Sequence, residues 1–404
     1  MIQVASVPIS LDAQLQLRKQ WREQLTSILN WWSSVAVDYK NGGYYGAVSN
    51  ENKVNELAPK GTVMLARICW AFSEACRFHP RNDWANHARR AFEYITNHCW
   101  DHEWGGTYWS VTATGAMHDG RKQFYGQAFV LYAFAAYYRI TQDGVALHLA
   151  KDLFEFIEDN SFDKQYGGYI EAVSRQKLPL DDQRLSDKDE NAAKSCNTHL
   201  HILEAYVLLY KVSPDKKLKE RIHYLLNVFH RKFITTENTL QLFFTLDWQP
   251  VGDLRSFGHE IEAAWLLYDA ATCIEDAELK TCFEKHAIGL VHSALQAMDE
   301  DGALWYEYNP SSQTWIYEKH SWPQAEAMLA FVVLAQLTGE AEWMERAIKS
   351  WKFIQQYLVD AQHGEWYWGI NREYEKMDKD KAGFWKCPYH STRSLLEVLY
   401  RLTV

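Results

Sequence analysis

Apolar and polar positions along this chain predict two kinds of helix. Residues 128–138 and 263–268 are apolar on nearly every side, which predicts helices that are buried all round. Residues 146–157 and 218–229 carry apolar side chains at helical spacing with charges between them, which predicts helices with one exposed face. The chain is therefore expected to alternate inner, fully buried helices with outer, half-buried ones.

A turn rich in glycine and aromatic residues precedes each predicted pair of helices. Three turns share one pattern and a fourth keeps half of it: Asp38-x3-Gly42-Gly43-x-Tyr45, Asp101-x3-Gly105-Gly106-x-Tyr108, Asp163-x3-Gly167-Gly168-Tyr169 and Asp360-x3-Gly364. Segments 243–248 and 302–306 fill the remaining two places more loosely. The glycines at 42, 105, 167, 302 and 364 give adjacent steps of 63, 62 and 62 residues, and such a fixed period indicates a repeat architecture.

Six pairs of helices predict an all-α protein, a closed (α/α)6 barrel that spans residues 1–404 as one domain. An open helical solenoid is the competing interpretation, and it would expose a long concave surface. Repeats and barrels carry one core at this length, and the sequence has no evident linker. The polar run from Arg175 to Lys194 is interpreted either as a functional rim or lid or as a tolerated insertion.

The charge balance of the chain restricts the kinds of molecule that it is expected to bind. The net charge is −10 with both signs scattered, which argues against nucleic acid or an anionic membrane surface as a partner. Met1–Ser10 lacks the features of a secretory signal, and no stretch approaches the length of a membrane span. Seven cysteines without metal-ligand spacing predict reduced thiols of a cytoplasmic protein. We expect a monomer or a weak homodimer.

Polar groups occur in register at the predicted starts of the inner helices. If these helices run parallel, their N-terminal ends share one mouth of the barrel, and the polar groups should converge there. Read in chain order they are Arg67; Tyr125 and Gln127; Asn197 and His201; His259 and Glu262; Trp322 and Glu326; and Trp385, His390 and Arg393. This convergence predicts the site of the chemistry.

Histidines at two of these starts suggest acid–base chemistry. A lone histidine on an apolar helix is more often a core residue, but His259 and His390 open different repeats at equivalent heights. Glu262 follows His259 by three residues and is expected to orient its imidazole, whereas Glu260 is expected to be solvated or to cap the helix. His199 and His201 should point to different faces, so no metal site is predicted.

Aromatic residues make up 15% of the chain and include 18 tryptophans. Those in the turns and at helix starts should surround the mouth, and flat apolar faces beside hydrogen-bonding groups suit a sugar. Carboxylates in the turns, such as Asp101 and Asp163, leave glycoside hydrolysis open as an alternative.

Two segments resemble the cellobiose 2-epimerases of the N-acylglucosamine 2-epimerase superfamily of (α/α)6 barrels. They are Ser256-Phe-Gly-His-Glu-Ile-Glu-Ala263 and Phe384-Trp-Lys-Cys-Pro-Tyr-His390. Segments 197–206 and 322–327 fit as well. Members that act on mannose or N-acylglucosamine typically have Pro-Gly-His where this chain has Phe257-Gly258-His259. Cys387 and Pro323 depart from the family pattern without touching an expected catalytic group.

The resemblance implies a cofactor-independent epimerisation. The reducing-end glucose of a β-1,4-linked disaccharide would invert at C2, through ring opening and an enediolate. It implies His259 and His390 as the two acid–base groups, His201 in ring opening, and Arg67 beside the enediolate oxygen. The implied substrate-binding residues are Tyr125, Asp189, Asn197, Trp322, Glu326 and Trp385.

Two other interpretations stay open. The same site could act as an aldose–ketose isomerase or as a mannose or N-acylglucosamine 2-epimerase. From a different class, the barrel could be a glycoside hydrolase or a sugar-binding module without catalysis.

Overall fold

The computed structural model describes residues 9–402. Most of the segment Met1–Ser10, in which no secretory signal is expected, therefore lies outside the described residues. Within them, no helix combines the length and the apolar character that crossing a membrane requires. The seven cysteines all lie in the described part of the chain, and none forms a disulfide.

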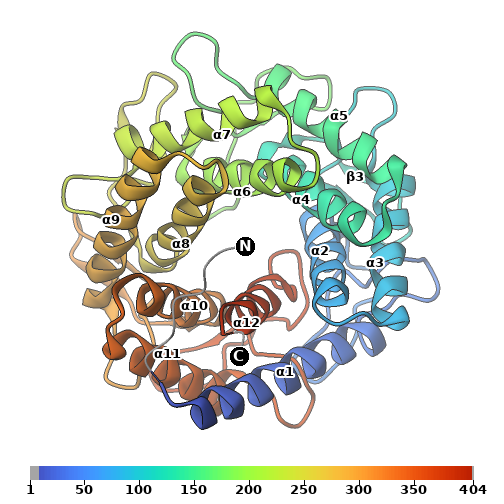
Figure 1. The fold of residues 1–404 in the computed structure, drawn as a ribbon. Coiled ribbons are helices and arrows are strands. Elements are labelled where there is room, and N and C mark those ends of the chain that lie inside the picture. Colours follow the sequence, from blue (N-terminus) through green and yellow to red (C-terminus); the bar gives the residue numbers. More distant parts are fainter. Residues whose placement is uncertain (1–8, 403–404) are drawn as a thin grey trace.

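Twelve α-helices of the described residues form two concentric rings (Figure 1). The inner ring consists of α2 (Thr62–Phe78), α4 (Phe124–Thr141), α6 (Cys196–Val212), α8 (Phe257–Cys273), α10 (Ser321–Thr338) and α12 (Tyr389–Arg401). The outer ring consists of α1 (Leu11–Ser34), α3 (Asn82–Tyr94), α5 (Gly144–Asn160), α7 (Lys216–Val228), α9 (Ala277–Ala294) and α11 (Ala341–Phe353). Short π-helical turns, η1 (Ile95–Cys99), η2 (Phe229–Phe233) and η4 (Ile354–Leu358), extend α3, α7 and α11, and a 3₁₀ turn, η3 (Leu295–Ala297), follows α9.

The inner ring is closed. Each inner helix packs against the next one in the chain, and α12 contacts both α10 and α2. The outer helix α1 covers α12, where Arg18 donates a hydrogen bond to the carbonyl of Leu399 at 2.7 Å. The closed (α/α)6 barrel is therefore confirmed, and the open solenoid is wrong.

The side-chain pattern explains which helices are inner. In α4 all residues from Phe124 to Tyr137 are buried, and in α10 only Trp322 is partly exposed between Ser321 and Ala335. In contrast, α3 and α7 bury one stripe of side chains and expose their charged positions. Aspartates cap α5, α7 and α9 by accepting from first-turn N–H groups, which helps to define where these outer helices begin.

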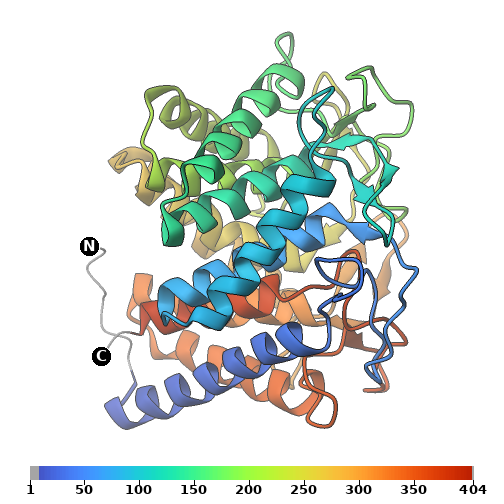
Figure 2. The same cartoon turned by 90° about the vertical axis from the view of Figure 1, so that its right-hand side faces the viewer.

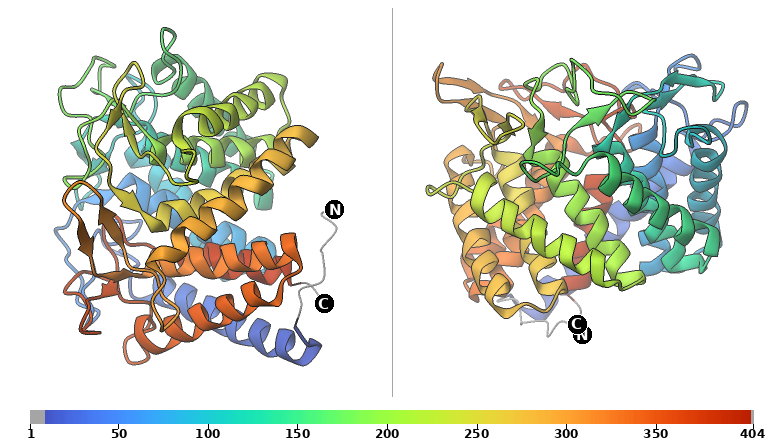
Figure 3. Two further views of the ribbon diagram at one scale, coloured as in Figure 1. Left: turned by 90° about the vertical axis from the view of Figure 1, so that its left-hand side faces the viewer. Right: turned by 90° about the horizontal axis from the view of Figure 1, so that it is seen from above.

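One end of the barrel carries all the short strands of the described residues (Figures 2 and 3). A strand before each of five inner helices pairs antiparallel with a strand of the next loop, in sheets β1-β2-β3, β4-β5, β6-β7-β8, β9-β10-β11 and β12-β13. The strands are Lys60–Gly61, Ser110–Val111, Met117–Asp119, Lys122–Gln123, Ala172–Val173, Lys194–Ser195, Phe243–Phe244, Pro250–Val251, Arg255–Ser256, Glu307–Asn309, Thr314–Ile316, Lys319–His320 and Gly369–Ile370. Before the sixth inner helix, Ala382 pairs with Val48 and so links the last loop to the first.

The repeated turns are real structural equivalents. Each of the six repeats has one isolated antiparallel bridge: Val37–Tyr44, Trp100–Thr107, Phe162–Tyr169, Ile234–Leu240, Met298–Leu304 and Val359–Trp366. The fourth turn is therefore 234–240, so its prediction at 243–248 was wrong; that segment forms strand β7 and the loop after it. Gly42 and Gly43 both have positive φ, and a Cβ on Gly43 would come within 2.8 Å of the Tyr94 ring, which explains the paired glycines.

A buried ion pair ties each of five turns to the start of an inner helix. In the first turn, Asp38 Oδ1 accepts from two turn N–H groups, while Lys60 Nζ donates to Asp38 Oδ2 at 2.8 Å. The equivalent pairs are Asp101–Lys122, Asp163–Lys194, Asp299 and Asp301 with Lys319, and Asp360–Lys381. Four of these lysines directly precede an inner helix, and Lys381 lies in the loop that leads to α12, so each pair anchors the loop end of the barrel.

Candidate active site

The predicted site residues converge at the loop end of the inner helices. His259 and His390 lie in the first turn of α8 and α12, and His201, Glu262 and Glu326 lie within the first two turns of their helices. The parallel arrangement of the inner ring thus gathers residues that are far apart in the sequence, such as Arg67 beside the Tyr389 ring. The convergence expected from the sequence is confirmed.

One arginine connects three buried carboxylates at the centre of this site. Arg393 donates to Glu204 at 2.6 Å and to Glu326 at 2.7 Å, and it also pairs with Glu262. All four side chains are buried. A single guanidinium offers several donors in a fixed plane, so it can hold three carboxylates that would otherwise repel one another.

Glu326 fixes one of the two predicted catalytic histidines. His390 Nδ1 lies 2.7 Å from Glu326 Oε1 and 3.9 Å from Glu262 Oε1. Glu326 Oε2 accepts from the Trp265 indole N–H at 3.0 Å, so its oxygens are already engaged. Glu326 is a fully buried partner of His390, and its expected role as a sugar contact stays a prediction.

Ser256 fixes the other histidine. His259 Nδ1 lies 2.8 Å from the Ser256 hydroxyl oxygen. Glu262 turns inward to Arg393, His390 and His201 and makes no hydrogen bond to His259, so its expected orienting role was wrong. The three-residue spacing placed Glu262 on a neighbouring helix face, but the buried arginine attracts its carboxylate more strongly.

Burial shifts the pKa values of these groups and so determines whether they carry a proton near pH 7. Desolvation lowers the pKa of His259 to about 4, although the nearby Glu262 carboxylate opposes this shift. Burial also lowers the pKa of His390 well below its usual value, again against the attraction of Glu262. Burial raises the pKa of Glu326. Each imidazole is therefore neutral near pH 7 and has the capacity to accept a proton.

His201 and Arg67 are two further titratable or charged residues of the site. His201 Nδ1 lies 2.9 Å from Glu204 Oε2, and its Nε2 lies 4.0 Å from Glu262 Oε1. Arg67 donates to the Tyr125 hydroxyl, and its guanidinium lies 4.2 Å from the centre of the Phe129 ring. Its Nε is buried without a partner, so this cation retains an unused donor.

Two tryptophans line the site where the sequence predicted them. The ring centre of Trp322 lies 5.0 Å from that of His259 and 5.3 Å from that of His390, so Trp322 lies beside both histidines. The ring centre of Trp385 lies 6.0 Å from that of Tyr125, whose hydroxyl accepts a hydrogen bond from Arg67. Flat aromatic faces thus border both groups of titratable side chains.

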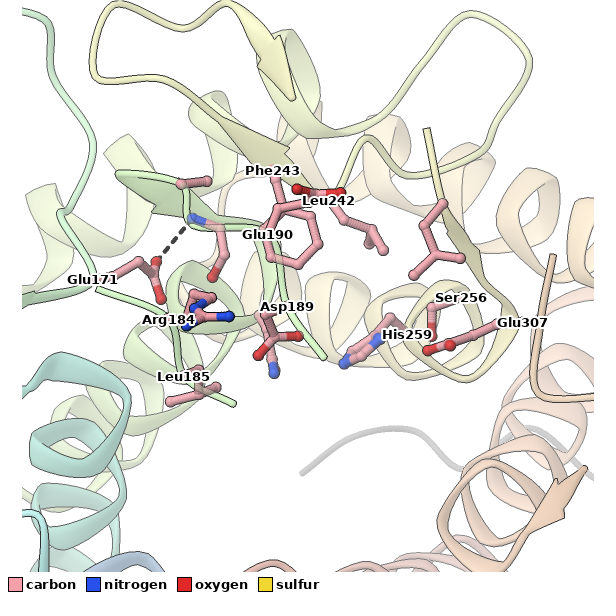
Figure 4. A pocket seen from close by; sticks show the side chains of 14 residues that line it. Glu171, Arg184, Leu185, Asp189, Glu190, Leu242, Phe243, Ser256, His259 and Glu307 are labelled. Atoms are coloured by element: carbon pink, nitrogen blue, oxygen red, sulfur yellow. Dashed lines mark hydrogen bonds between the residues drawn. The ribbon is translucent and has the colours of Figure 1, made fainter. Parts of the chain in front are cut away.

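A pocket of about 520 Å³ opens over His259 (Figure 4). The polar loop 175–193 forms one wall of it. This position favours a rim over a tolerated insertion, and a functional role for the loop stays a prediction. Asp189 and Asn197, two predicted sugar contacts, line the pocket together with Ser256 and Glu307. The Asn197 side-chain oxygen is buried without a partner, and a concave site with a few converging polar groups is typical of small-molecule binding.

Glu171 supports the same pocket from the third turn. It accepts hydrogen bonds from the Ser195 N–H at 2.8 Å and the Thr198 hydroxyl at 2.6 Å. Burial raises its pKa to about 7. The carboxyl group thereby links the turn to the start of α6, next to Asn197.

Several residues of the site carry a different role from the one the sequence suggested. Glu260 is buried in an ion pair with Arg255, at 2.9 Å, instead of being solvated or capping the helix. Ser256, Glu307, Glu171 and Glu204 were not predicted as site residues, and Arg393 was noted only for its position. His199 faces away from His201, as expected, and its ring nitrogens are used by Ser195 and Tyr169.

A metal ion has no free place among the catalytic carboxylates. Glu262, Glu326 and His390 bring ligand atoms within 4.8 Å of one another. Arg393 pairs with both carboxylates, and its guanidinium already supplies the positive charge there. The contacts of this cluster therefore fit acid–base chemistry by the histidines.

Comparison with known proteins gives one consistent relationship. The model of the N-acylglucosamine 2-epimerase family matches residues 42–394. The chain is 38% identical over 386 residues to a cellobiose 2-epimerase of Bacteroides fragilis, which covers 95% of this chain and 98% of that protein. It is 36% identical to one of Ruminococcus albus, over 94% of this chain and 97% of that protein.

Solved structures agree with the sequence relatives. The structure of the cellobiose 2-epimerase of Bacillus thermoamylovorans B4167 superimposes with a TM-score of 0.91 at 34% identity, covering 96% of this chain and 100% of that one. The resemblance inferred from the two histidine segments is therefore confirmed. The chain belongs to the N-acylglucosamine 2-epimerase family.

Proposed function

We propose that this protein is a cellobiose 2-epimerase, which interconverts glucose and mannose at the reducing end of β-1,4-linked disaccharides. The observation that carries the proposal is the pair His259 and His390, which open two inner helices and both lie beside the Trp322 ring. Relatives with this activity in their names are 32–38% identical to the chain over most of its length.

Inversion at C2 requires two acid–base groups, one on each face of the carbon. Once the sugar ring is open, the proton on C2 is adjacent to a carbonyl and becomes removable. One imidazole takes it from one face to leave an enediolate, and the other returns a proton to the opposite face. Which histidine removes the proton depends on the direction of the reaction.

The contacts of the two histidines fit these two roles, proton removal and proton return. His259 is neutral near pH 7 and hydrogen bonded to a hydroxyl, so it is ready to act as a base. His390 shares a hydrogen bond with Glu326, whose raised pKa lets the pair hold a proton. His201, oriented by Glu204, assists ring opening, and Arg67 stabilises the negative charge of the enediolate.

The remaining residues position the sugar. Trp322 and Trp385 offer aromatic faces for stacking, and Tyr125, Asn197 and Asp189 offer hydrogen-bonding groups. No cofactor is required, because the reaction moves only protons. The cysteines without disulfides are consistent with a cytoplasmic location, which remains a prediction, as does the monomeric or weakly dimeric state.

The turn carboxylates argue against hydrolysis. Asp101 is held by Lys122 and Arg175, and Asp163 is held by Lys194, each at 2.8–2.9 Å. These cations lower the pKa values of both carboxyl groups. A general acid needs a raised pKa, so neither aspartate suits the general-acid role in glycosidic bond cleavage.

Proton NMR with cellobiose in D2O tests the proposal. We expect a new mannose-type anomeric signal and deuterium at C2, with the glycosidic bond intact. Free glucose would instead indicate a hydrolase, and a ketose product would indicate an isomerase. Parallel samples with mannose and N-acetylglucosamine identify a monosaccharide preference.

The variants His259→Ala and His390→Ala test the mechanism. Each should abolish deuterium exchange at C2, whereas His148→Ala, at an exposed position of α5, should leave it unchanged. Exchange that persists in both catalytic variants would contradict the two-histidine mechanism even if the epimerase activity itself is real.

A further inference from the structure

Three potential metal ligands meet on the outer ring of the barrel, apart from the inner-ring residues described above. His230 belongs to η2, while Cys282 and His286 lie one helical turn apart on α9. His230 Nδ1 is 2.8 Å from His286 Nε2 and 3.6 Å from Cys282 Sγ. His230 is exposed and the other two are partly exposed, so an ion can reach them from solvent.

These distances are close to those of a metal-bound set. With Zn–N bonds of about 2.0 Å and Zn–S bonds of about 2.3 Å, tetrahedral geometry separates N and S ligands by about 3.5 Å and two N ligands by about 3.3 Å. The sulfur–nitrogen distance already fits, and the two imidazole nitrogens need to separate by only about 0.5 Å. All three ligand atoms lie within 4.8 Å of one another.

We propose that His230, Cys282 and His286 form a binding site for a borderline-soft divalent transition-metal ion such as Zn²⁺, with solvent as the fourth ligand. One thiolate and two imidazoles are ligands that zinc prefers over magnesium or calcium. On binding, the thiol releases its proton to solvent, and the proton between the imidazoles moves to the other nitrogen of its ring. The ion then links η2 to α9.

The three ligand atoms are already in contact before an ion arrives. Without metal, the same atoms form a hydrogen-bonded group, which explains their close approach in the structure.

Cobalt(II) titration of the full-length protein tests this proposal directly. Binding of one equivalent should produce a thiolate-to-cobalt absorption band in the near ultraviolet and tetrahedral bands in the visible region, and Zn²⁺ should displace both. Cys282→Ser should remove the thiolate band, and His286→Ala should weaken binding at least tenfold. Cys273→Ser, at a partly exposed cysteine on α8, is the matched control and should behave like the wild type.

Thermal unfolding gives an independent readout. Zinc at one hundred times its Kd should lower the unfolding equilibrium constant of the wild type about a hundredfold and raise the Tm, with no effect on Cys282→Ser. Epimerase activity should be the same in Cys282→Ser as in the wild type. Cobalt binding without a thiolate band, binding that survives Cys282→Ser, or no stoichiometric binding would each overturn the proposal.

Discussion

At the scale of single residues, the site depends on which partner each buried charge finds. Glu262 and Glu326 both turn to Arg393, and Glu326 also holds His390. His259 is left with Ser256, a neutral hydroxyl. The two imidazoles therefore differ in their partners although both begin an inner helix.

Removal of the Ser256 hydroxyl should slow the reaction without unfolding the protein. Ser256→Ala removes the hydrogen bond that orients His259, which is worth about 1 kcal/mol and so about fivefold in kcat. The measurement is kcat and KM for cellobiose; KM should change little. Ser256→Thr retains a hydroxyl and should recover most of the rate, and an equal loss in both variants would exclude an orienting role.

Glu171 should make the protein less stable as pH rises. An ion-paired acid with a lowered pKa has the opposite effect. Its pKa in the folded state is raised to about 7, above the unfolded value. As pH rises from about 4.5 to 7, the unfolded chain loses this proton first, so the contribution of Glu171 to the free energy of unfolding falls, by an amount of the order of 3 kcal/mol.

Equilibrium urea unfolding of the wild type and Glu171→Gln at pH 5 and pH 8 measures this contribution. The glutamine has no proton to lose, so the wild type should lose more stability than the variant as pH rises. If the two proteins change in parallel, the carboxyl group of Glu171 is not protonated in the folded state.

At the scale of elements, the aspartate–lysine pairs hold each turn against the start of an inner helix. The aspartate also accepts from the N–H groups of its own turn, so a single side chain both shapes the turn and anchors it. In the last repeat, Glu365 takes the place of the second glycine with φ of 62°, and its carboxylate binds Lys386 and Trp32. That contact compensates a backbone conformation that glycine usually provides.

Breaking one buried pair should destabilise the fold strongly. Lys60→Met leaves Asp38 buried without its cation and should lower the free energy of unfolding by about 3–5 kcal/mol, measured in urea. Lys40→Met removes an exposed pair with Glu56 and should cost less than about 1 kcal/mol. The double variant Asp38→Asn, Lys60→Met should recover part of the loss, because no unpaired charge remains.

At the scale of the whole molecule, closure of the barrel creates the site. Inner helices that run parallel bring six starts to one end (Figure 3). The loops of that end add a pocket above them. The loop 175–193 reaches this pocket although it carries no helix. The extent of the domain, proposed as residues 1–404, remains a prediction.

The rim loop should contribute to substrate binding more than to the chemical step. Asp189→Ala removes a carboxylate from the pocket wall and should raise KM for cellobiose about tenfold, since a hydrogen bond to a charged group is worth about 1.5 kcal/mol or more. The kcat value should stay within about twofold. Asp187→Ala, exposed in the same loop, is the control; a loss confined to kcat would place Asp189 in the chemistry instead.

The sequence by itself determined the helix pairs, the period of their repeat and the positions of the polar helix starts, and it favoured the barrel over the open solenoid. These features follow from local periodicity: an apolar helix must be buried, and turns with paired glycines recur wherever the backbone needs positive φ. The identity of the histidine pair followed from the resemblance of two short segments to a known family.

Only the tertiary structure decided which side chains pair. Arg393 was noted as one polar helix start among several, yet it holds Glu262, which spacing had assigned to His259, and Glu326, which the resemblance had assigned to the sugar. The group His230, Cys282 and His286 joins residues whose spacing in the sequence has no repeated pattern. In four of the five turn pairs the lysine follows its aspartate by 20–22 residues, but only the structure shows that the two side chains pair. Electrostatic attraction in a buried site acts through space, so only the closed barrel determines its outcome.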